Sequence, residues 1–119
     1  MRRVLIIDDH PGFRRLASKL LEAGGFAVVG EAEDGRAGLA EARRLQPEVV
    51  MLDVLLPDTS GFAVAEALAE GAAAPVVVLV SSRSASDIAP ALERSPAQGF
   101  ISKRELTAAI FAAVVDGRG

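Results

Sequence analysis

The sequence predicts an α/β fold, a doubly wound five-stranded parallel sheet with helices on both faces. Short apolar runs alternate with stretches of helical spacing five times in 119 residues. The runs are continuously apolar, which indicates strands buried on both faces. No long linker, repeat or low-complexity stretch interrupts the alternation. This pattern is typical of a parallel sheet in one domain, which we expect to span residues 1–119.

The first strand–helix unit starts at the amino terminus. The apolar run at residues 4–7 predicts a strand, and Pro11 stands where the first helical residue would lie. The glycine pair at 24–25 is expected to end this helix. Its inward face is expected to consist of Phe13, Leu16, Ala17, Leu20 and Leu21.

The second and third units follow directly. Residues 26–32 predict a strand, and Asp34 is placed to cap a helix that ends near Leu45. Residues 49–52 predict another buried strand, which ends at Asp53. After a turn at residues 57–61, a helix is expected to reach Glu70. Its inward residues are expected to be Phe62, Ala65, Leu68 and Ala69.

The fourth unit is predicted by the apolar run at residues 76–80 and a short helix at 87–94. The fifth unit has a strand at 99–102, followed by capping-box spacing at 102–105 that predicts the start of the last helix. One apolar stripe of this helix is expected to face the sheet: Leu106, Ala109, Ile110, Ala113 and Val114. A second stripe is either half-sunk between neighbouring helices or a partner surface: Ala108, Phe111, Ala112 and Val115.

The topology predicts where the polar residues meet. Right-handed crossovers favour the strand order 2-1-3-4-5, and sites in such sheets lie beyond the carboxyl ends of the strands. Asp8 and Asp9 follow the first strand, Asp53 the third, Ser81 the fourth and Lys103 the fifth. We therefore expect three carboxylates in one crevice, with a hydroxyl and an ammonium group opposite them.

This arrangement predicts phosphoryl chemistry. Two like charges about 4 Å apart repel by roughly 4 kcal/mol at an effective dielectric constant near 20, and Mg²⁺ relieves such repulsion while it binds phosphate oxygens. Lysine suits the same phosphate, and one carboxylate can serve as the nucleophile. Taken singly, Asp8 and Asp9 could also be helix-capping acids and Asp53 a turn residue. His10 is expected to be an exposed residue at the start of a helix, not a ligand.

With these residues in place, the chain resembles, from end to end, the receiver domain of a two-component response regulator. The resemblance is carried by VLIIDDH at 4–10, VMLD at 50–53 with Leu56, Pro57 and Gly61, VLVSS at 78–82 and GFISK at 99–103. It implies a flavodoxin-like (βα)5 fold. It also implies that Asp53 is the phosphoacceptor and that Mg²⁺ is held by Asp8, Asp9, Asp53 and the backbone carbonyl of Leu55.

The resemblance also implies roles for the switch residues. Ser81 takes the place of the switch serine or threonine, Phe100 that of the switch aromatic residue, and Lys103 that of the invariant lysine. Phe100 could equally be partly core. Ser82 stands beside Ser81 where alanine or another small residue is frequent. Residues 8–14 further resemble regulators with a C-terminal helix-turn-helix output domain, and residues 116–119 look like the start of a linker.

The implied partners are a sensor histidine kinase or phosphotransfer protein, and an output domain or second copy of the chain. Two alternatives remain: a phosphohydrolase with an aspartate nucleophile and a docking module that needs no phosphorylation. The net charge of −3 argues against direct nucleic-acid binding. No apolar run approaches the ~18 residues of a membrane span, and the first one stops at Asp8, which is too early for a signal peptide. We therefore expect a cytoplasmic protein.

Overall fold

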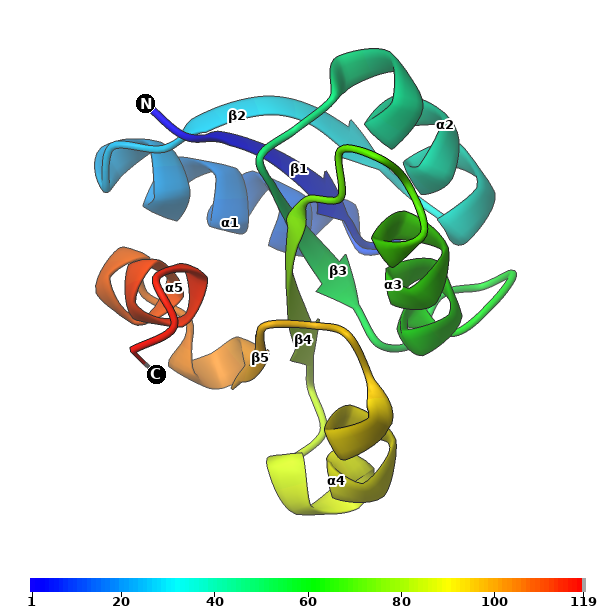
Figure 1. Cartoon of the computed structure of the whole chain (residues 1–119). Coiled ribbons are helices and arrows are strands. Elements are labelled where there is room, and N and C mark those ends of the chain that lie inside the picture. Colours follow the sequence, from blue (N-terminus) through cyan, green and yellow to red (C-terminus); the bar gives the residue numbers. More distant parts are fainter. Residues whose placement is uncertain (119) are drawn as a thin grey trace.

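The computed structural model describes residues 1–118, and within them a five-stranded parallel sheet has the order β2-β1-β3-β4-β5 (Figure 1). The fold class and strand order predicted from the sequence are confirmed. The elements in chain order are β1 Arg3–Ile7, α1 Pro11–Ala23, β2 Ala27–Ala32, α2 Gly35–Leu45, β3 Val49–Asp53, α3 Gly61–Ala69, β4 Val76–Ser81, α4 Ala85–Arg94, β5 Gly99–Ser102, the 3₁₀ turn η1 Lys103–Glu105 and α5 Ala108–Val115.

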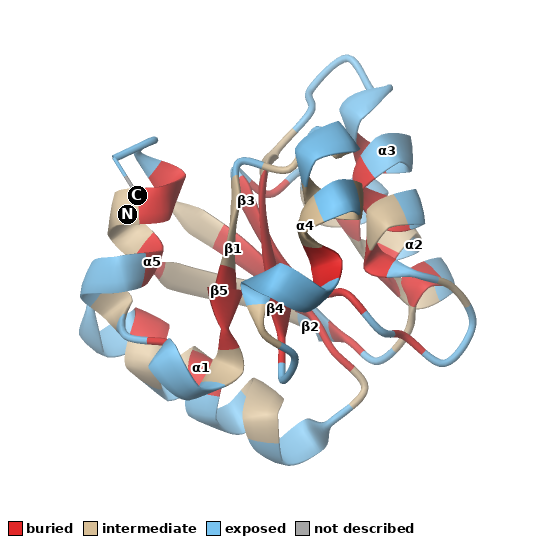
Figure 2. Ribbon diagram, turned by 90° about the horizontal axis from the view of Figure 1, so that it is seen from below, coloured by how far each residue is buried: buried red, intermediate tan, exposed pale blue. Residues whose placement is uncertain are grey.

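The helices cover the sheet in two layers. α1 and α5 lie on one face and α2, α3 and α4 on the other (Figure 1). Alternate strand residues point to opposite layers, as the pleat requires. In β1, Val4 and Ile6 pack toward α1 and α5, while Leu5 and Ile7 pack toward α2 and α3. The central strands are therefore buried on both faces, as Figure 2 shows, which explains their continuously apolar sequences.

Several helix starts follow from local capping. The side chains of Asp34 and Ser60 accept hydrogen bonds from backbone amides in the first turns of α2 and α3. The capping box predicted at residues 102–105 is wrong. That segment forms the 3₁₀ turn, and the Thr107 hydroxyl caps α5 by accepting from the Ile110 amide at 3.0 Å.

The orientation predicted for the last helix is right in part: Leu106 and Val114 are buried as predicted, but the second stripe also faces the core. Phe111 is fully buried and Val115 nearly so, whereas Ile110 is 42% exposed. The stripe proposed as a partner surface, Ala108, Phe111, Ala112 and Val115, thus packs toward the core and is not an exposed surface. Because of the extra 3₁₀ turn, α5 begins only after its capping residue, Thr107. The helix then packs against β4, β5 and α1, and its one aromatic side chain, Phe111, contacts Phe26.

Smaller errors concern single residues of α1 and α3. Leu16, predicted to face inward on α1, is 53% exposed. On α3, Ala69 is exposed and Val64 is buried in its place. Where alanine occupies positions on several sides of a helix, apolar spacing leaves the orientation ambiguous, and contact with the sheet decides it.

Gly61 lets the turn after β3 pass close to the strand. Its amide donates to the Val54 carbonyl at 2.7 Å, and a β-carbon at this position would collide with the Asp53 carbonyl oxygen. Only glycine fits this approach. The backbone that carries Asp53 and the segment after it is therefore fixed from the α3 side.

Candidate functional site

The register of the sheet brings the polar strand ends together. Asp53 lies beside Val80 and Ser81 beside Ser102. Asp8 follows β1 directly, and its backbone amide donates to the Ala32 carbonyl at 3.0 Å. All these residues occupy the carboxyl edge of the sheet, at the switch point between β1 and β3 that the sequence predicted.

Lys103 joins two buried carboxylates. Its Nζ lies 2.7 Å from Asp8 Oδ2 and 3.2 Å from Asp53 Oδ2. Asp8 is fully buried and Asp53 is 3% exposed. Because both anions lie away from water, this single ammonium group balances much of their charge. The sequence-predicted convergence of Asp8, Asp53 and Lys103 is thus observed.

Phe13 assists Lys103 in a way that the sequence did not predict. The ammonium group lies 4.5 Å from the centre of the Phe13 ring, within the range of a cation–π contact. Helical spacing indicated only that Phe13 faces inward. It gave no sign that the ring would lie under a lysine from the other end of the chain.

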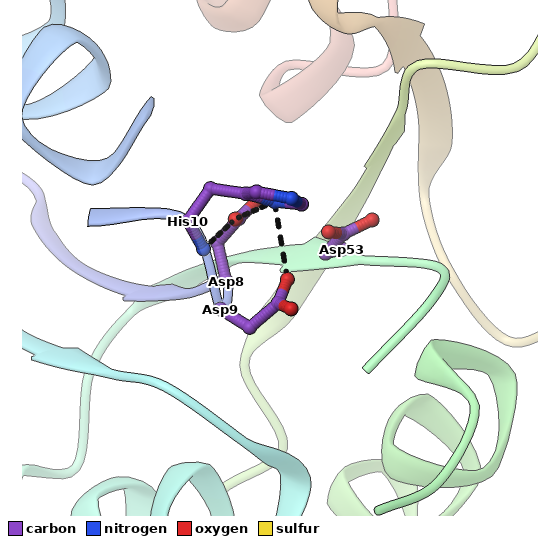
Figure 3. Close-up of side chains that lie close together, drawn as sticks. All are labelled: Asp8, Asp9, His10 and Asp53. Atoms are coloured by element: carbon purple, nitrogen blue, oxygen red, sulfur yellow. Dashed lines mark hydrogen bonds and ion pairs between the residues drawn. The ribbon is translucent and has the colours of Figure 1, made fainter. Parts of the chain in front are cut away.

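The remaining acids and His10 form the outer side of the cluster. The side chain of Asp9 is 35% exposed, and that of His10 is 67% exposed. His10 Nδ1 lies 3.1 Å from Asp9 Oδ1 and 3.2 Å from Asp8 Oδ1 (Figure 3). Together with Asp53, these residues offer one ligand atom each, all within 4.8 Å of one another. His10 is exposed, as predicted, but its contacts with the two aspartates were not expected, although its position directly after them was a signal.

The donor set suits a hard divalent cation. Asp9 and Asp53 line the crevice at this edge of the sheet, and the carboxylate of the buried Asp8 belongs to the same cluster. Among the described residues, Asp8 Oδ2 and Asp9 Oδ1 are buried atoms without a hydrogen-bond partner, although each has an ionic neighbour, Lys103 or His10. Oxygen ligands in such a cluster can hold Mg²⁺.

Burial raises the pKa of Asp53, and the charge of Asp8 raises it further. The ammonium group of Lys103 and the amide of Leu55, which donates to Asp53 Oδ1 at 3.2 Å, lower the pKa and offset part of this rise. Keeping Asp53 ionised therefore destabilises the folded protein. This destabilisation is present above the raised pKa and disappears as the pH falls toward the unfolded pKa of 3.8.

Ser81, Ser82 and Leu55, three of the other predicted site residues, line a crevice at the same edge of the sheet. It has a volume of about 240 Å³ and is lined by Asp9, His10, Asp53, Leu55, Leu56, Pro57, Ser81, Ser82 and Lys103. Ser81 is 2% exposed, and its hydroxyl accepts from the Arg83 amide at 3.0 Å. Ser82 and Leu55 are exposed at the rim. Phe100 is not part of this lining. It lies half-buried on β5, packed against the core on the α4 side.

Neutralising Asp53 is expected to stabilise the metal-free protein. In EDTA at neutral pH, Asp53→Asn should raise the free energy of unfolding by roughly 1 kcal/mol, the low end of the repulsion between like charges about 4 Å apart. The gain should shrink as the pH falls, because the wild-type carboxyl then takes up a proton. Urea unfolding at several pH values measures both effects.

The matched control for this variant is Glu66→Gln on the exposed side of α3, which should change stability by less than about 0.5 kcal/mol. Mg²⁺ at ten times its dissociation constant should stabilise the wild type by roughly 1.4 kcal/mol. An Asn variant less stable than wild type in EDTA would contradict the charge cluster.

Fold and site together define a phosphoacceptor switch domain of the doubly wound α/β class. The chain belongs to the response regulator receiver domain family, whose model matches residues 4–115. In the described chain, residues 1–118, there is no helix with the length and apolar character needed to cross a membrane.

Relatives and solved structures agree with this family. A putative transcriptional regulator of Pseudomonas aeruginosa is 36% identical over 88% of this chain and 51% of its own length. Another is BvgA of Bordetella pertussis, a virulence-factor putative positive transcription regulator, 39% identical over 87% of this chain and 49% of its own length. A third, protein-glutamate methylesterase/protein-glutamine glutaminase 6 of Anaeromyxobacter dehalogenans, is 42% identical over 87% of this chain and 29% of its own length.

Among solved structures, the receiver domain of the putative response regulator NarL from Mycobacterium tuberculosis superposes with a TM-score of 0.84 at 35% identity. The match covers 99% of this chain and 97% of that one. The chain therefore matches an isolated receiver domain almost completely. By contrast, it spans about half the length, or less, of the curated relatives.

Proposed function

We propose that Asp53 accepts a phosphoryl group from a histidine kinase or phosphotransfer protein. The observation that carries this proposal is the pairing of Asp53 and Asp8 by Lys103 inside a buried crevice. An oxygen of Asp53 attacks phosphorus, an acyl phosphate forms, and the donor's P–N bond breaks as the imidazole leaves. Lys103 then pairs with a phosphoryl oxygen and neutralises part of the added charge.

Mg²⁺ is the proposed cofactor. Asp8, Asp9 and Asp53 would hold it through their clustered carboxylates, and the resemblance to receiver domains adds the backbone carbonyl of Leu55. Its charge would neutralise the phosphoryl oxygens during transfer. Apart from accepting and slowly losing its own phosphoryl group, the domain is proposed to catalyse no reaction.

The proposed conformational change on phosphorylation involves the ends of β4 and β5. In the structure the Ser81 hydroxyl accepts from the Arg83 amide. A phosphoryl oxygen offers that hydroxyl a new acceptor, so the segment after β4 would move toward Asp53. Phe100 lies next to β4 on the neighbouring strand, half-buried, and is proposed to repack as this segment moves. Ser82, at the rim, would lie beside the phosphoryl group.

We propose that this change is passed to an output domain in the cytoplasm, and not to nucleic acid directly. Two transcription regulators, of which the matched segment makes up about half the length, support a transcriptional output. In this proposal residues 1–119 are one receiver domain, and residues 116–119 begin the linker. Gly119 lies outside the described residues, so the linker is supported by sequence alone.

Acetyl phosphate provides the test of phosphoryl acceptance. The protein is incubated with acetyl phosphate and Mg²⁺, with EDTA in a parallel sample, and its intact mass is followed over time. We expect a gain of one phosphoryl group that requires Mg²⁺ and persists for minutes or longer. Rapid multiple turnover would indicate a phosphohydrolase instead, and no gain in either sample would indicate a docking module.

Leu55 is expected to control the lifetime of the phosphoryl group. Its side chain is 57% exposed at the rim and offers no hydrogen bond to an attacking water. Leu55→Asn and Leu55→Glu should therefore change the dephosphorylation half-life severalfold, measured by intact mass after removal of acetyl phosphate. Leu16→Asn, at an exposed leucine of α1, is the control. Equal half-lives in all variants would show that Leu55 does not face the acyl phosphate.

A further inference from the structure

His10 is the only histidine in a chain without cysteine. It belongs, with Asp8, Asp9 and Asp53, to the cluster of side chains that could hold a metal ion. Its Nδ1 approaches two carboxylates at once, at 3.1 Å from Asp9 Oδ1 and 3.2 Å from Asp8 Oδ1. In Figure 3 the ring lies over both aspartates, on the side of Asp53. An imidazole that merely begins a helix would not need to face two acids in this way.

These two N–O distances match the distance between neighbouring ligand atoms around a bound metal ion. Two ligands bound at about 2.1 Å and at right angles to each other lie roughly 3.0 Å apart, and tetrahedral ligands lie slightly farther apart. The nitrogen already has this spacing from each of the two oxygens, and the cluster's ligand atoms all lie within 4.8 Å of one another. A cation shared by all three would therefore need little movement of the side chains.

The chain around His10 supports this orientation. The His10 backbone amide donates to Asp8 Oδ1 at 2.8 Å. Asp8 itself is fully buried, and its other oxygen is held by Lys103 at 2.7 Å. Pro11, the first residue of α1, follows directly. A fixed carboxylate and a restrained backbone hold the imidazole ring near the clustered acids, although the outer edge of the ring is exposed.

We propose that His10 Nδ1, with Asp8 and Asp9, ligates a borderline divalent cation such as Co²⁺, Ni²⁺ or Zn²⁺, and holds it more tightly than Mg²⁺. Carboxylates alone suit Mg²⁺, whereas an imidazole nitrogen favours these later metals. In this state the ring proton resides on Nε2, which faces solvent, and Nδ1 donates its lone pair. The inference rests on the metal site of the proposed function and adds a nitrogen ligand to it.

The alternative use of the same geometry is a hydrogen bond. With the proton on Nδ1, His10 would donate to the two carboxylates and only hold them in place. A bound cation would then push the ring away. The two arrangements differ in whether the nitrogen contacts the metal, which a spectroscopic probe reports directly.

Co²⁺ is the probe for the test, with the whole chain free of any histidine tag. Visible absorption follows binding, and proton NMR follows the imidazole ring signals, which can come only from His10. We expect ring signals with the large paramagnetic shifts of a bound ligand. His10→Gln and His10→Phe should weaken Co²⁺ binding at least about tenfold, since losing even an outer-shell contact typically costs ten- to a hundredfold.

Mg²⁺ titrations of the same proteins separate this inference from the proposed function. We expect Mg²⁺ affinity to fall much less than Co²⁺ affinity in both variants, because magnesium prefers oxygen ligands. If Mg²⁺ binds and Co²⁺ gives the His10 ring only the through-space shifts of a nearby residue, without the contact-shifted ring N–H signal of a directly bound imidazole, the nitrogen ligand is disproved while the receiver site stands. If neither cation binds the wild type, the metal site itself is wrong. The ring signals are read in wild type, so a poorly folded variant leaves the conclusion intact.

Discussion

Phe111→Ala is expected to lower the free energy of unfolding by about 3–5 kcal/mol, the usual cost of removing a buried aromatic ring. Phe111 is fully buried, and its ring packs edge-to-face against Phe26 with centres 5.0 Å apart. Truncation would leave a cavity between α1, α5 and the sheet. Urea unfolding of the wild type and the variant gives the difference.

Ile110→Ala is the matched control, one residue away on the same helix. Ile110 is 42% exposed, so its truncation should cost less than about 1 kcal/mol. The two variants together report which side of α5 faces the core. A larger loss at Ile110 than at Phe111 would contradict the orientation of α5 and restore the arrangement that helical spacing alone suggested.

Lys103→Met is expected to have a comparable effect, for an electrostatic reason. Removing one partner of a buried ion pair typically costs about 3–5 kcal/mol, because the remaining charge is left without compensation. Here two carboxylates, Asp8 and Asp53, lose the same ammonium group. In EDTA at neutral pH the variant should therefore unfold at much lower urea concentration than wild type.

Two further measurements on this variant distinguish charge from packing. Mg²⁺ should recover part of the loss, since it supplies positive charge to the same oxygens. Lowering the pH should also recover stability: without Lys103 the raised pKa of Asp53 rises further, so the carboxyl is protonated sooner. Arg104→Met, at the exposed neighbouring residue, is the control. Equal losses in both variants, independent of Mg²⁺ and pH, would contradict the ion-pair account.

The sequence predicted the sheet and the carboxyl-edge site well for a physical reason. Strands buried on both faces give unbroken apolar runs, and in a parallel sheet their polar ends must meet at one edge. Asp8, Asp53 and Lys103 could therefore be brought together from topology alone. The family resemblance added roles for Ser81 and Phe100, which topology does not provide.

The features that the sequence did not predict depend on the packing of particular side chains. α5 is rich in alanine, so two stripes were equally apolar, and only the fit of Phe111 against Phe26 decides between them. The start of α5 at Thr107 depends on a 3₁₀ turn that capping-box spacing mimicked. The contacts of Phe13 and His10 arise where β1 passes into α1, and no periodic pattern describes such a turn.

Chemical trapping identifies the residue that carries the phosphoryl group. The protein is phosphorylated with acetyl phosphate and Mg²⁺, reduced with borohydride and digested, and its peptides are sequenced by mass spectrometry. Borohydride converts an aspartyl phosphate to homoserine, so we expect homoserine at position 53 and aspartate at positions 8 and 9. Homoserine at Asp8 or Asp9, or unmodified Asp53 in protein that has gained a phosphoryl group, would contradict this expectation.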